Sequence, residues 1–267
     1  MSLRYGVLSD IHANLPALQT ARAVLDREGV DAYLCAGDLV GYGPHPNECV
    51  EVIADLRAVC VAGNHELMLL GSLPLHRSTR LVRQTLAWTQ QVLRNDVRDY
   101  LARLPLLAEA PGGVVVTHAS LNDPQRYITR PADAAQQLDR LAVVRPAANV
   151  LVLGHTHRQW AYDRSVGTLA AAADGTVDLG ASRRCLLNPG SVGQSRTRED
   201  APRVRFLLLD LGQRRATFYV LPYDVERCRE DLRRHALPAG TYHLPPARVP
   251  GPLRRLRDVL ARGFGLG

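Results

Sequence analysis

The chain has 267 residues, of which 46% are hydrophobic, and carries a formal net charge of +7 at pH 7. This length allows one large domain with a substantial core. No run of about 18 apolar residues occurs, which excludes a transmembrane helix and gives no reason to expect a membrane partner. No signal-peptide pattern follows Met1, so we expect a cytoplasmic protein.

Strand and helix patterns alternate from the start of the chain. Short apolar runs predict buried strands at residues 5–8, 33–36, 58–62, 114–116 and 150–153. Helical apolar stripes occupy residues 14–28, ending at Gly29, and residues 46–56. Parallel strands with helical crossovers are the natural interpretation.

A longer polar helical segment follows, with helices expected at residues 79–94 and 96–103. It carries no obvious ligand, and we expect it to pack around the site. After residue 157 short strands are expected at 168–173, 176–179 and 184–187, then a hairpin of 204–209 with 216–221. These strands predict a second, largely antiparallel sheet. A final amphipathic helix, with apolar residues between 253 and 260, is expected to dock on the domain or on a second subunit.

Polar clusters follow five of the predicted strands. They are Ser9-Asp10-Ile11-His12, Gly37-Asp38, Gly63-Asn64-His65-Glu66, Thr117-His118-Ala119-Ser120 and Gly154-His155-Thr156-His157. A parallel sheet gathers the carboxyl ends of its strands into one crevice, where ligands bind. The sequence therefore predicts a site there, and first of all a metal site.

The donor atoms of these clusters indicate the kind of metal. Asp10 and His12 are two positions apart on one strand end, which places both side chains on the same face, and His155 and His157 repeat this spacing. Imidazole nitrogens mixed with carboxylate and amide oxygens favour manganese, iron, cobalt, nickel or zinc over calcium or magnesium. The five cysteines are widely spaced without a Cys-x-x-Cys pair, which argues against a zinc ribbon.

In order and approximate spacing, the five clusters resemble the motifs of the calcineurin-like metallophosphoesterases. The turn Asn188-Pro189-Gly190-Ser191 is also common in small bacterial and archaeal members, so the resemblance runs from residue 10 to residue 191. It implies an α/β fold, a four-layer αββα sandwich of the metallo-dependent phosphatase type. The whole chain, residues 1–267, would be one such domain, completed or decorated by strands and helices at 203–262.

The resemblance also implies a dinuclear metal centre with manganese favoured. Two sets of three ligands would each hold one ion, and one carboxylate would bridge them: Asp10, His12 and His157 for the first, Asn64, His118 and His155 for the second, and Asp38 as the bridge. A hydroxide shared by the metals would attack phosphorus directly. His65 would protonate or stabilise the leaving oxygen, and Glu66 would orient His65.

Substrate preference is less strongly indicated. The Ser/Thr protein phosphatases have Asp-Arg-Gly where this chain has Gly41-Tyr42-Gly43, so a bidentate phosphate clamp is missing. Candidate substrate contacts are Tyr42, His45, Arg126 and Arg158. An aromatic side chain beside the metals suits a nucleotide or aryl leaving group, which favours a phosphodiesterase acting on a small phosphate ester or nucleotide.

Three alternatives stay open. The first is a phosphomonoesterase or protein phosphatase of the same fold. The second is a non-catalytic metal-binding scaffold, as in the retromer subunit that resembles this family, although His65 argues for turnover. The third is a nucleic-acid phosphoesterase, because residues 183–267 hold 17 arginines against 8 acidic residues; without interleaved aromatics a solvated surface is favoured. The sequence is also compatible with an oligomer.

Overall fold

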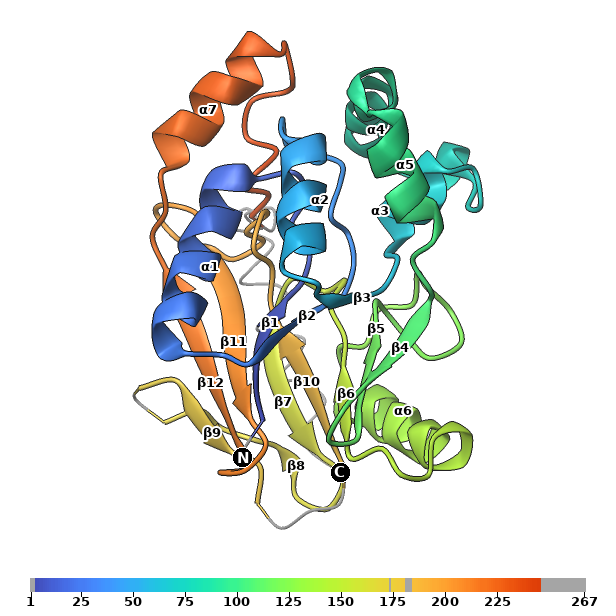
Figure 1. Ribbon diagram of the computed structural model, residues 1–267, viewed down its shortest axis with the longest axis vertical. Coiled ribbons are helices and arrows are strands. Elements are labelled where there is room, and N and C mark those ends of the chain that lie inside the picture. Colours follow the sequence, from blue (N-terminus) through green and yellow to red (C-terminus); the bar gives the residue numbers. More distant parts are fainter. Residues whose placement is uncertain (1–2, 173, 181–183, 246–267) are drawn as a thin grey trace, which may run out of the picture.

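The structure is a computed structural model that describes residues 3–172, 174–180 and 184–245 (Figure 1). Within these residues the strands form two mixed sheets of six strands each. The first has the order β3-β2-β1-β11-β12-β9, with β1 (Arg4–Leu8), β2 (Ala32–Cys35), β3 (Val59–Cys60), β9 (Thr176–Asp178), β11 (Val204–Asp210) and β12 (Arg215–Leu221). The second has the order β4-β5-β6-β10-β7-β8, with β4 (Leu107–Ala110), β5 (Val114–Thr117), β6 (Val150–Val152), β7 (Gln159–Asp163), β8 (Gly167–Thr168) and β10 (Cys185–Pro189).

The two sheets pack face to face around a buried apolar layer. Val7 and Leu34 of the first sheet share this layer with Val116 and Leu187 of the second, and all four are fully buried. Because side chains alternate along a strand, Leu8 of β1 belongs to a different cluster on the outer face of the sheet. The first sheet is thus covered on both faces.

Helices cover the outer faces of both sheets (Figure 1). The helical elements are α1 (Leu15–Glu28), α2 (Pro46–Asp55), α3 (Asn64–Leu69), the 3-10 turn η1 (Leu75–Arg77), α4 (Arg80–Val92), α5 (Asn95–Ala102), α6 (Pro131–Val144) and α7 (Val225–Arg234). Leu18 of α1 and Ile53 of α2 pack with Phe206 on the first sheet. Leu138 of α6 packs with Leu151 on the second. The expected four-layer αββα sandwich is confirmed.

Local signals determine where α1 begins and ends. Asn14 caps the amino terminus, because its side-chain oxygen accepts a hydrogen bond from the Ala17 N–H at 3.3 Å. Gly29 adopts the left-handed conformation (φ 67°) at the other end, which glycine does without steric cost. The helix predicted at 14–28 is therefore confirmed to within one residue, and its cap lies directly after the first polar cluster.

The prediction of a separate antiparallel sheet near the carboxyl end is wrong. β10 instead inserts between β6 and β7, parallel to the first and antiparallel to the second, and β11 pairs antiparallel with β1. Had these strands formed their own sheet, β1 and β6 would each have kept an unpaired edge. The hairpin of β11 and β12 is confirmed, whereas the strand expected at 168–173 ends at Thr168.

Several elements were not anticipated, namely α3, η1, β4, β7, α6 and α7. The amphipathic helix expected at 253–260 lies outside the described residues. Among the helices of the described ranges, none has the length and apolar character needed to cross a membrane.

Candidate metal centre

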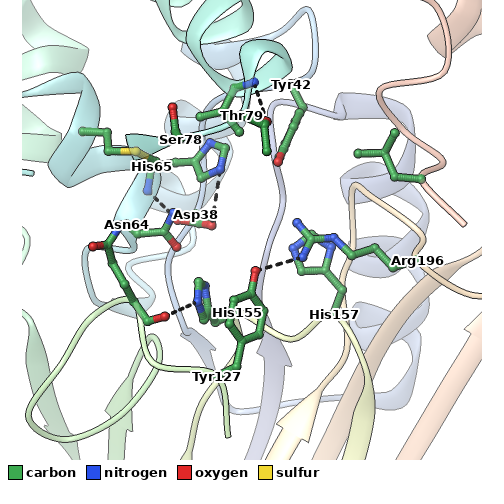
Figure 2. A pocket seen from close by; sticks show the side chains of 14 residues that line it. Asp38, Tyr42, Asn64, His65, Ser78, Thr79, Tyr127, His155, His157 and Arg196 are labelled. Atoms are coloured by element: carbon green, nitrogen blue, oxygen red, sulfur yellow. Dashed lines mark hydrogen bonds and ion pairs between the residues drawn. The ribbon is translucent and has the colours of Figure 1, made fainter. Parts of the chain in front are cut away.

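The polar clusters converge at the carboxyl ends of five strands drawn from both sheets. The first sheet contributes the loops after β1, β2 and β3, and the second contributes those after β5 and β6. Backbone hydrogen bonds join these loops, from the Asp10 N–H to Gly37 O at 3.0 Å and from the Gly154 N–H to His118 O at 2.8 Å. Five of the assembled side chains line a cavity of about 360 Å³, namely Asp38, Asn64, His65, His155 and His157 (Figure 2).

The first group of donor atoms combines Asp10, His12 and His157. The Nε2 atom of His157 lies 3.3 Å from Oδ1 of Asp10 and 3.2 Å from Nε2 of His12. The three side chains are buried, and their donor atoms all lie within 4.8 Å of one another. This is the set expected to hold the first ion.

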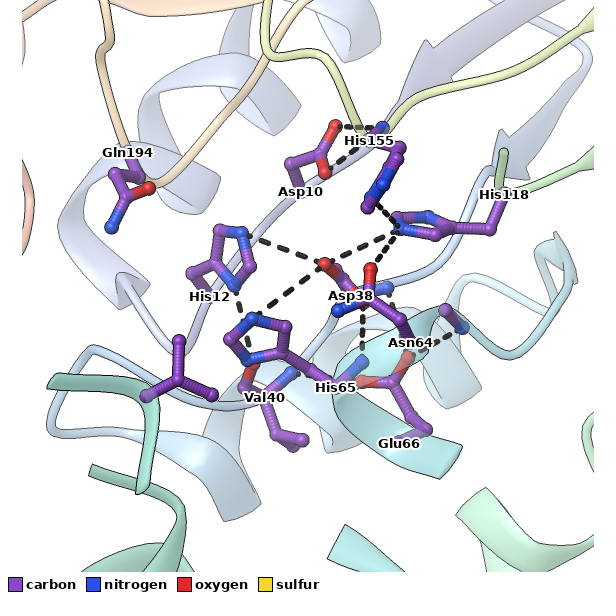
Figure 3. Close-up of polar contacts among 12 residues, drawn as sticks. Asp10, His12, Asp38, Val40, Asn64, His65, Glu66, His118, His155 and Gln194 are labelled. Atoms are coloured by element: carbon purple, nitrogen blue, oxygen red, sulfur yellow. Dashed lines mark hydrogen bonds and ion pairs between the residues drawn. The ribbon is translucent and has the colours of Figure 1, made fainter. Parts of the chain in front are cut away.

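The second group combines Asp38, His118 and His155, and the Asn64 amide adjoins it (Figure 3). Nε2 of His118 lies 3.4 Å from Oδ2 of Asp38, 2.9 Å from Oδ1 of Asn64 and 3.2 Å from Nδ1 of His155. Oδ2 of Asp38 is also 3.8 Å from Nε2 of His12. Asp38 therefore lies between the two groups, as a bridging ligand would.

The outer nitrogen of each histidine in the two groups faces a backbone carbonyl oxygen. His12 Nδ1 approaches Val40 O at 3.2 Å, and His118 Nδ1 approaches Ala36 O at 2.7 Å. Since a carbonyl oxygen only accepts, each such nitrogen carries the hydrogen, and the opposite nitrogen faces the cluster. This is the usual support of metal-binding histidines. The other two pairs are His155 Nε2 with Gln125 O at 3.0 Å and His157 Nδ1 with Gln194 O at 2.8 Å.

Burial and neighbouring charges shift the pKa values within the cluster in different directions. Burial lowers the pKa of His12 and of His157 well below the ordinary value, with smaller contributions from nearby positive groups. Burial also lowers the pKa of His118, but the charge and hydrogen bond of Asp38, the charge of Asp10 and the Ala36 carbonyl together outweigh it and raise the pKa to about 10. Burial would raise the pKa of Asp38, yet His118 and His65 hold it well below its usual range.

The backbone at the cluster is strained. Five of the seven residues expected as ligands have positive φ, a conformation that costs on the order of 1 kcal/mol or more at each position. They are Asp10 (52°), His12 (48°), Asp38 (54°), His155 (64°) and His157 (60°). Strain concentrated at polar side chains that converge is typical of a functional site.

Nitrogen and oxygen donors in two adjoining groups fit a pair of divalent transition-metal ions.

His65 lies at the edge of the cluster. Its ring centre is 4.7 Å from that of His12 and 4.8 Å from that of Tyr42, and its Nε2 is 4.0 Å from Oδ2 of Asp38. Its Nδ1 is buried and, among the described atoms, has no hydrogen-bond partner. Nε2 thus faces the cavity side of Asp38, where a phosphate ester would lie.

The profile of the family described as calcineurin-like phosphoesterase matches residues 3–159, more than half of the chain. The chain belongs to the calcineurin-like phosphoesterases. It is therefore a metal-dependent hydrolase of phosphoric ester bonds.

Two curated relatives and two solved structures are similar to this phosphoesterase. An uncharacterized protein of Methanocaldococcus jannaschii is 29% identical over 87% of this chain and 93% of its own. A symmetrical bis(5'-nucleosyl)-tetraphosphatase of Chromohalobacter salexigens is 31% identical over 75% of this chain and 80% of its own. The crystal structure of a metallophosphoesterase from Sphaerobacter thermophilus is 30% identical, with a TM-score of 0.74 over 91% of this chain and 97% of its own. A hypothetical protein from Pyrococcus horikoshii shares the fold, with 20% identity and a TM-score of 0.72 over 92% and 100%.

The hydrogen bonds of Glu66 differ from those expected of a residue that orients His65. Its two carboxylate oxygens accept four backbone N–H groups, those of Gly63 (2.7 Å), Asp38 (2.9 Å), Leu39 (2.8 Å) and Val40 (3.1 Å). These bonds occupy both oxygens, so Glu66 does not orient the His65 ring. In this phosphoesterase Glu66 instead fixes the loop that carries Asp38.

Of the four expected substrate contacts, only Tyr42 lines the cavity beside the cluster. His45 precedes α2 and pairs with Asp231 of α7 at 2.9 Å, so it joins two helices instead. Arg126 pairs with Asp133 at 3.3 Å outside the cavity, and Arg158 lines a neighbouring cavity. None of these three side chains lines the cavity beside the cluster, and their roles as substrate contacts stay predictions.

Arg196 is a cavity residue that the sequence did not indicate. Its guanidinium donates to the Tyr127 hydroxyl at 3.4 Å (Figure 2). It also donates to Oε1 of Gln194 at 3.0 Å. The Tyr127 ring in turn packs against His155, with centres 4.1 Å apart. The available signal was position, because Arg196 follows the Asn188-Pro189-Gly190-Ser191 turn by five residues. In a chain with 33 arginines this signal is weak.

Proposed function

We propose that this phosphoesterase is a dinuclear metal-dependent phosphodiesterase. The observation that carries the proposal is the position of Asp38, whose Oδ2 lies 3.4 Å from His118 of one donor group and 3.8 Å from His12 of the other. A carboxylate shared in this way is suited to bridge two ions. The ligands proposed are those named from the sequence, with manganese favoured among the transition metals.

Two bound ions would supply Lewis-acid stabilisation of the phosphoryl oxygens and an activated water for in-line attack on phosphorus. The chain's own residues supply the remaining functions, namely positioning, exclusion of water and proton transfer. The Asp10 and Asp38 carboxylates and the four histidines would hold the ions in place, and burial excludes bulk water from these side chains. When the new P–O bond forms and the bond to the leaving group breaks, the leaving oxygen takes a proton, and His65 is positioned to donate it through Nε2.

A nucleotide is the substrate class that the cavity favours. Tyr42 and Tyr127 offer aromatic faces in the cavity beside the metal cluster, and Arg196 offers a positive charge. Aromatic faces suit a base, and a guanidinium suits a phosphate. The similar protein from Chromohalobacter salexigens is named a bis(5'-nucleosyl)-tetraphosphatase, which supports a small nucleotide over a protein substrate.

The test is hydrolysis of bis(p-nitrophenyl) phosphate and p-nitrophenyl phosphate by metal-stripped protein reconstituted with manganese. We expect manganese-dependent turnover with a preference for the diester. His65→Ala should lower kcat by about 100- to 10,000-fold, the usual contribution of a proton-transfer group. His235→Ala, which removes an exposed histidine outside the cavity, is the matched control and should keep wild-type turnover. Failure to hydrolyse either ester with two ions bound would contradict the proposal.

A further inference from the structure

A second cavity, of about 350 Å³, adjoins the metal cluster and is lined mainly by arginine. Its lining consists of Arg158, Gln159, Arg196, Thr197, Arg198 and Arg205. None of these described lining residues is acidic or aromatic. A concave surface of this composition attracts anions and offers no aromatic face for a base.

This cavity adjoins the cavity at the metal cluster, and two observations place them side by side. Arg196 lines both cavities. His157 lines the first cavity and Arg158, the next residue along the chain, lines the second. A substrate held at the metal cluster through one phosphate would therefore have the second cavity beside it.

Two of the arginines keep their positive charge available. Arg205 is neutralised by Glu199, which accepts from its Nη2 at 2.6 Å and from its Nη1 at 3.2 Å. Among the described residues, Arg196 bonds only to uncharged partners, the Tyr127 hydroxyl and the Gln194 amide oxygen. The Arg158 guanidinium is exposed and has no hydrogen-bond or ion-pair partner among the described residues.

We propose that the cavity of Arg158 and Arg196 is a second anion subsite, which holds a phosphate group joined by an anhydride linkage to the phosphate at the metals. The inference rests on the proposed function and narrows its substrate class. Nucleotides that contain a polyphosphate chain should be better substrates than simple diesters. Two phosphates joined by an anhydride linkage fit the cavity at the metal cluster and the arginine-lined cavity that adjoins it. A nucleic-acid strand is less suited, because the subsite lacks the aromatic platforms that single strands stack on.

The test compares two substrates on the manganese-loaded full chain, diadenosine tetraphosphate and bis(p-nitrophenyl) phosphate, in wild type and in Arg158→Ala. We expect the ratio of the two KM values, tetraphosphate over diester, to rise about tenfold, the usual effect of losing one charge-assisted hydrogen bond. Arg140→Ala, which removes an exposed arginine from α6, is the control with the same loss of charge and should leave the ratio unchanged. An unchanged ratio in Arg158→Ala would overturn the subsite.

Binding provides a readout that does not depend on turnover. Tripolyphosphate supplied with equimolar manganese is titrated calorimetrically into the manganese-loaded wild type, Arg158→Ala and Arg140→Ala. We expect weaker binding in Arg158→Ala alone, and a loss of affinity with added salt. Equal affinity in all three proteins would overturn the proposal, as would a larger effect of Arg158→Ala on a single-stranded oligonucleotide than on tripolyphosphate. If the wild type hydrolyses neither ester, the proposed function fails, and this titration alone decides the subsite.

Discussion

The Nε2 atoms of His12 and His157 lie 3.2 Å apart although the two residues are 145 positions apart in the chain. Each ring is fixed from behind by a carbonyl oxygen, that of Val40 or of Gln194. We therefore expect His12→Ala to lower manganese affinity at least about tenfold, because one ligand of the first group is lost. Calorimetric titration of metal-stripped protein measures this. Unchanged affinity would remove His12 from the ligand set.

Glu66 is predicted to contribute to stability more than to chemistry. A glutamine at this position keeps one acceptor oxygen, so that part of the set of four backbone N–H groups loses its acceptor. Since Glu66 is fully buried, we expect Glu66→Gln to lower the free energy of unfolding by about 1–3 kcal/mol, measured by urea denaturation. Glu48→Gln, at an exposed position on α2, is the control. Equal effects of the two substitutions would contradict the anchoring role.

Metal binding is predicted to release a proton. Burial lowers the pKa of His118, but Asp38, with smaller contributions from Asp10 and the Ala36 carbonyl, outweighs burial and raises the pKa to about 10, so His118 carries a proton at pH 7 before metal binds. Ligation requires the neutral ring, and the apparent manganese affinity should therefore rise with pH up to about that value. Titration calorimetry at pH 7 in two buffers of different ionisation enthalpy detects the proton. Identical heats in both buffers would contradict the prediction.

Gly154 is predicted to be essential for the position of Asp10. A Cβ atom there would lie 1.8 Å from Oγ of Ser9 and 2.8 Å from Oδ2 of Asp10, so Gly154→Ala should displace the carboxylate and weaken manganese binding. Gly71→Ala is the control, because a Cβ at Gly71 meets no atom within 4 Å but the residue has φ +81°. It should cost about 1 kcal/mol of backbone strain and leave metal affinity intact. If Gly154→Ala leaves metal affinity unchanged, the close approach of Gly154 to Asp10 does not control metal binding.

The fold class and the cluster could be predicted because their signals are local. Asp10 and His12, like His155 and His157, stand directly after apolar strands, and the carboxyl ends of parallel strands meet at one edge. The structure brings all seven expected ligand side chains into one cluster. Their roles as ligands, the single-domain organisation of residues 1–267, the native metal and the cytoplasmic location stay predictions.

The other features depend on tertiary contacts that no local pattern encodes. Arg196 reaches the cavity because β10 enters the second sheet beside β6, which places the loop after β10 against the cluster. His45 follows Asp38 closely in sequence, yet its side chain turns to Asp231 on α7, a helix that was not anticipated. Glu66 looked like a partner of the adjacent His65, but the loop after β2 lies close enough to occupy both carboxylate oxygens.

The central claim is that two ions act together at the cluster shared by Asp38. The most direct test follows turnover of bis(p-nitrophenyl) phosphate while manganese is titrated into metal-stripped protein and the bound metal is counted. We predict that turnover appears as the second ion binds, and that Asp38→Asn binds fewer than two ions and has no measurable turnover. Full turnover with one ion per chain, or wild-type behaviour of Asp38→Asn, would contradict the claim.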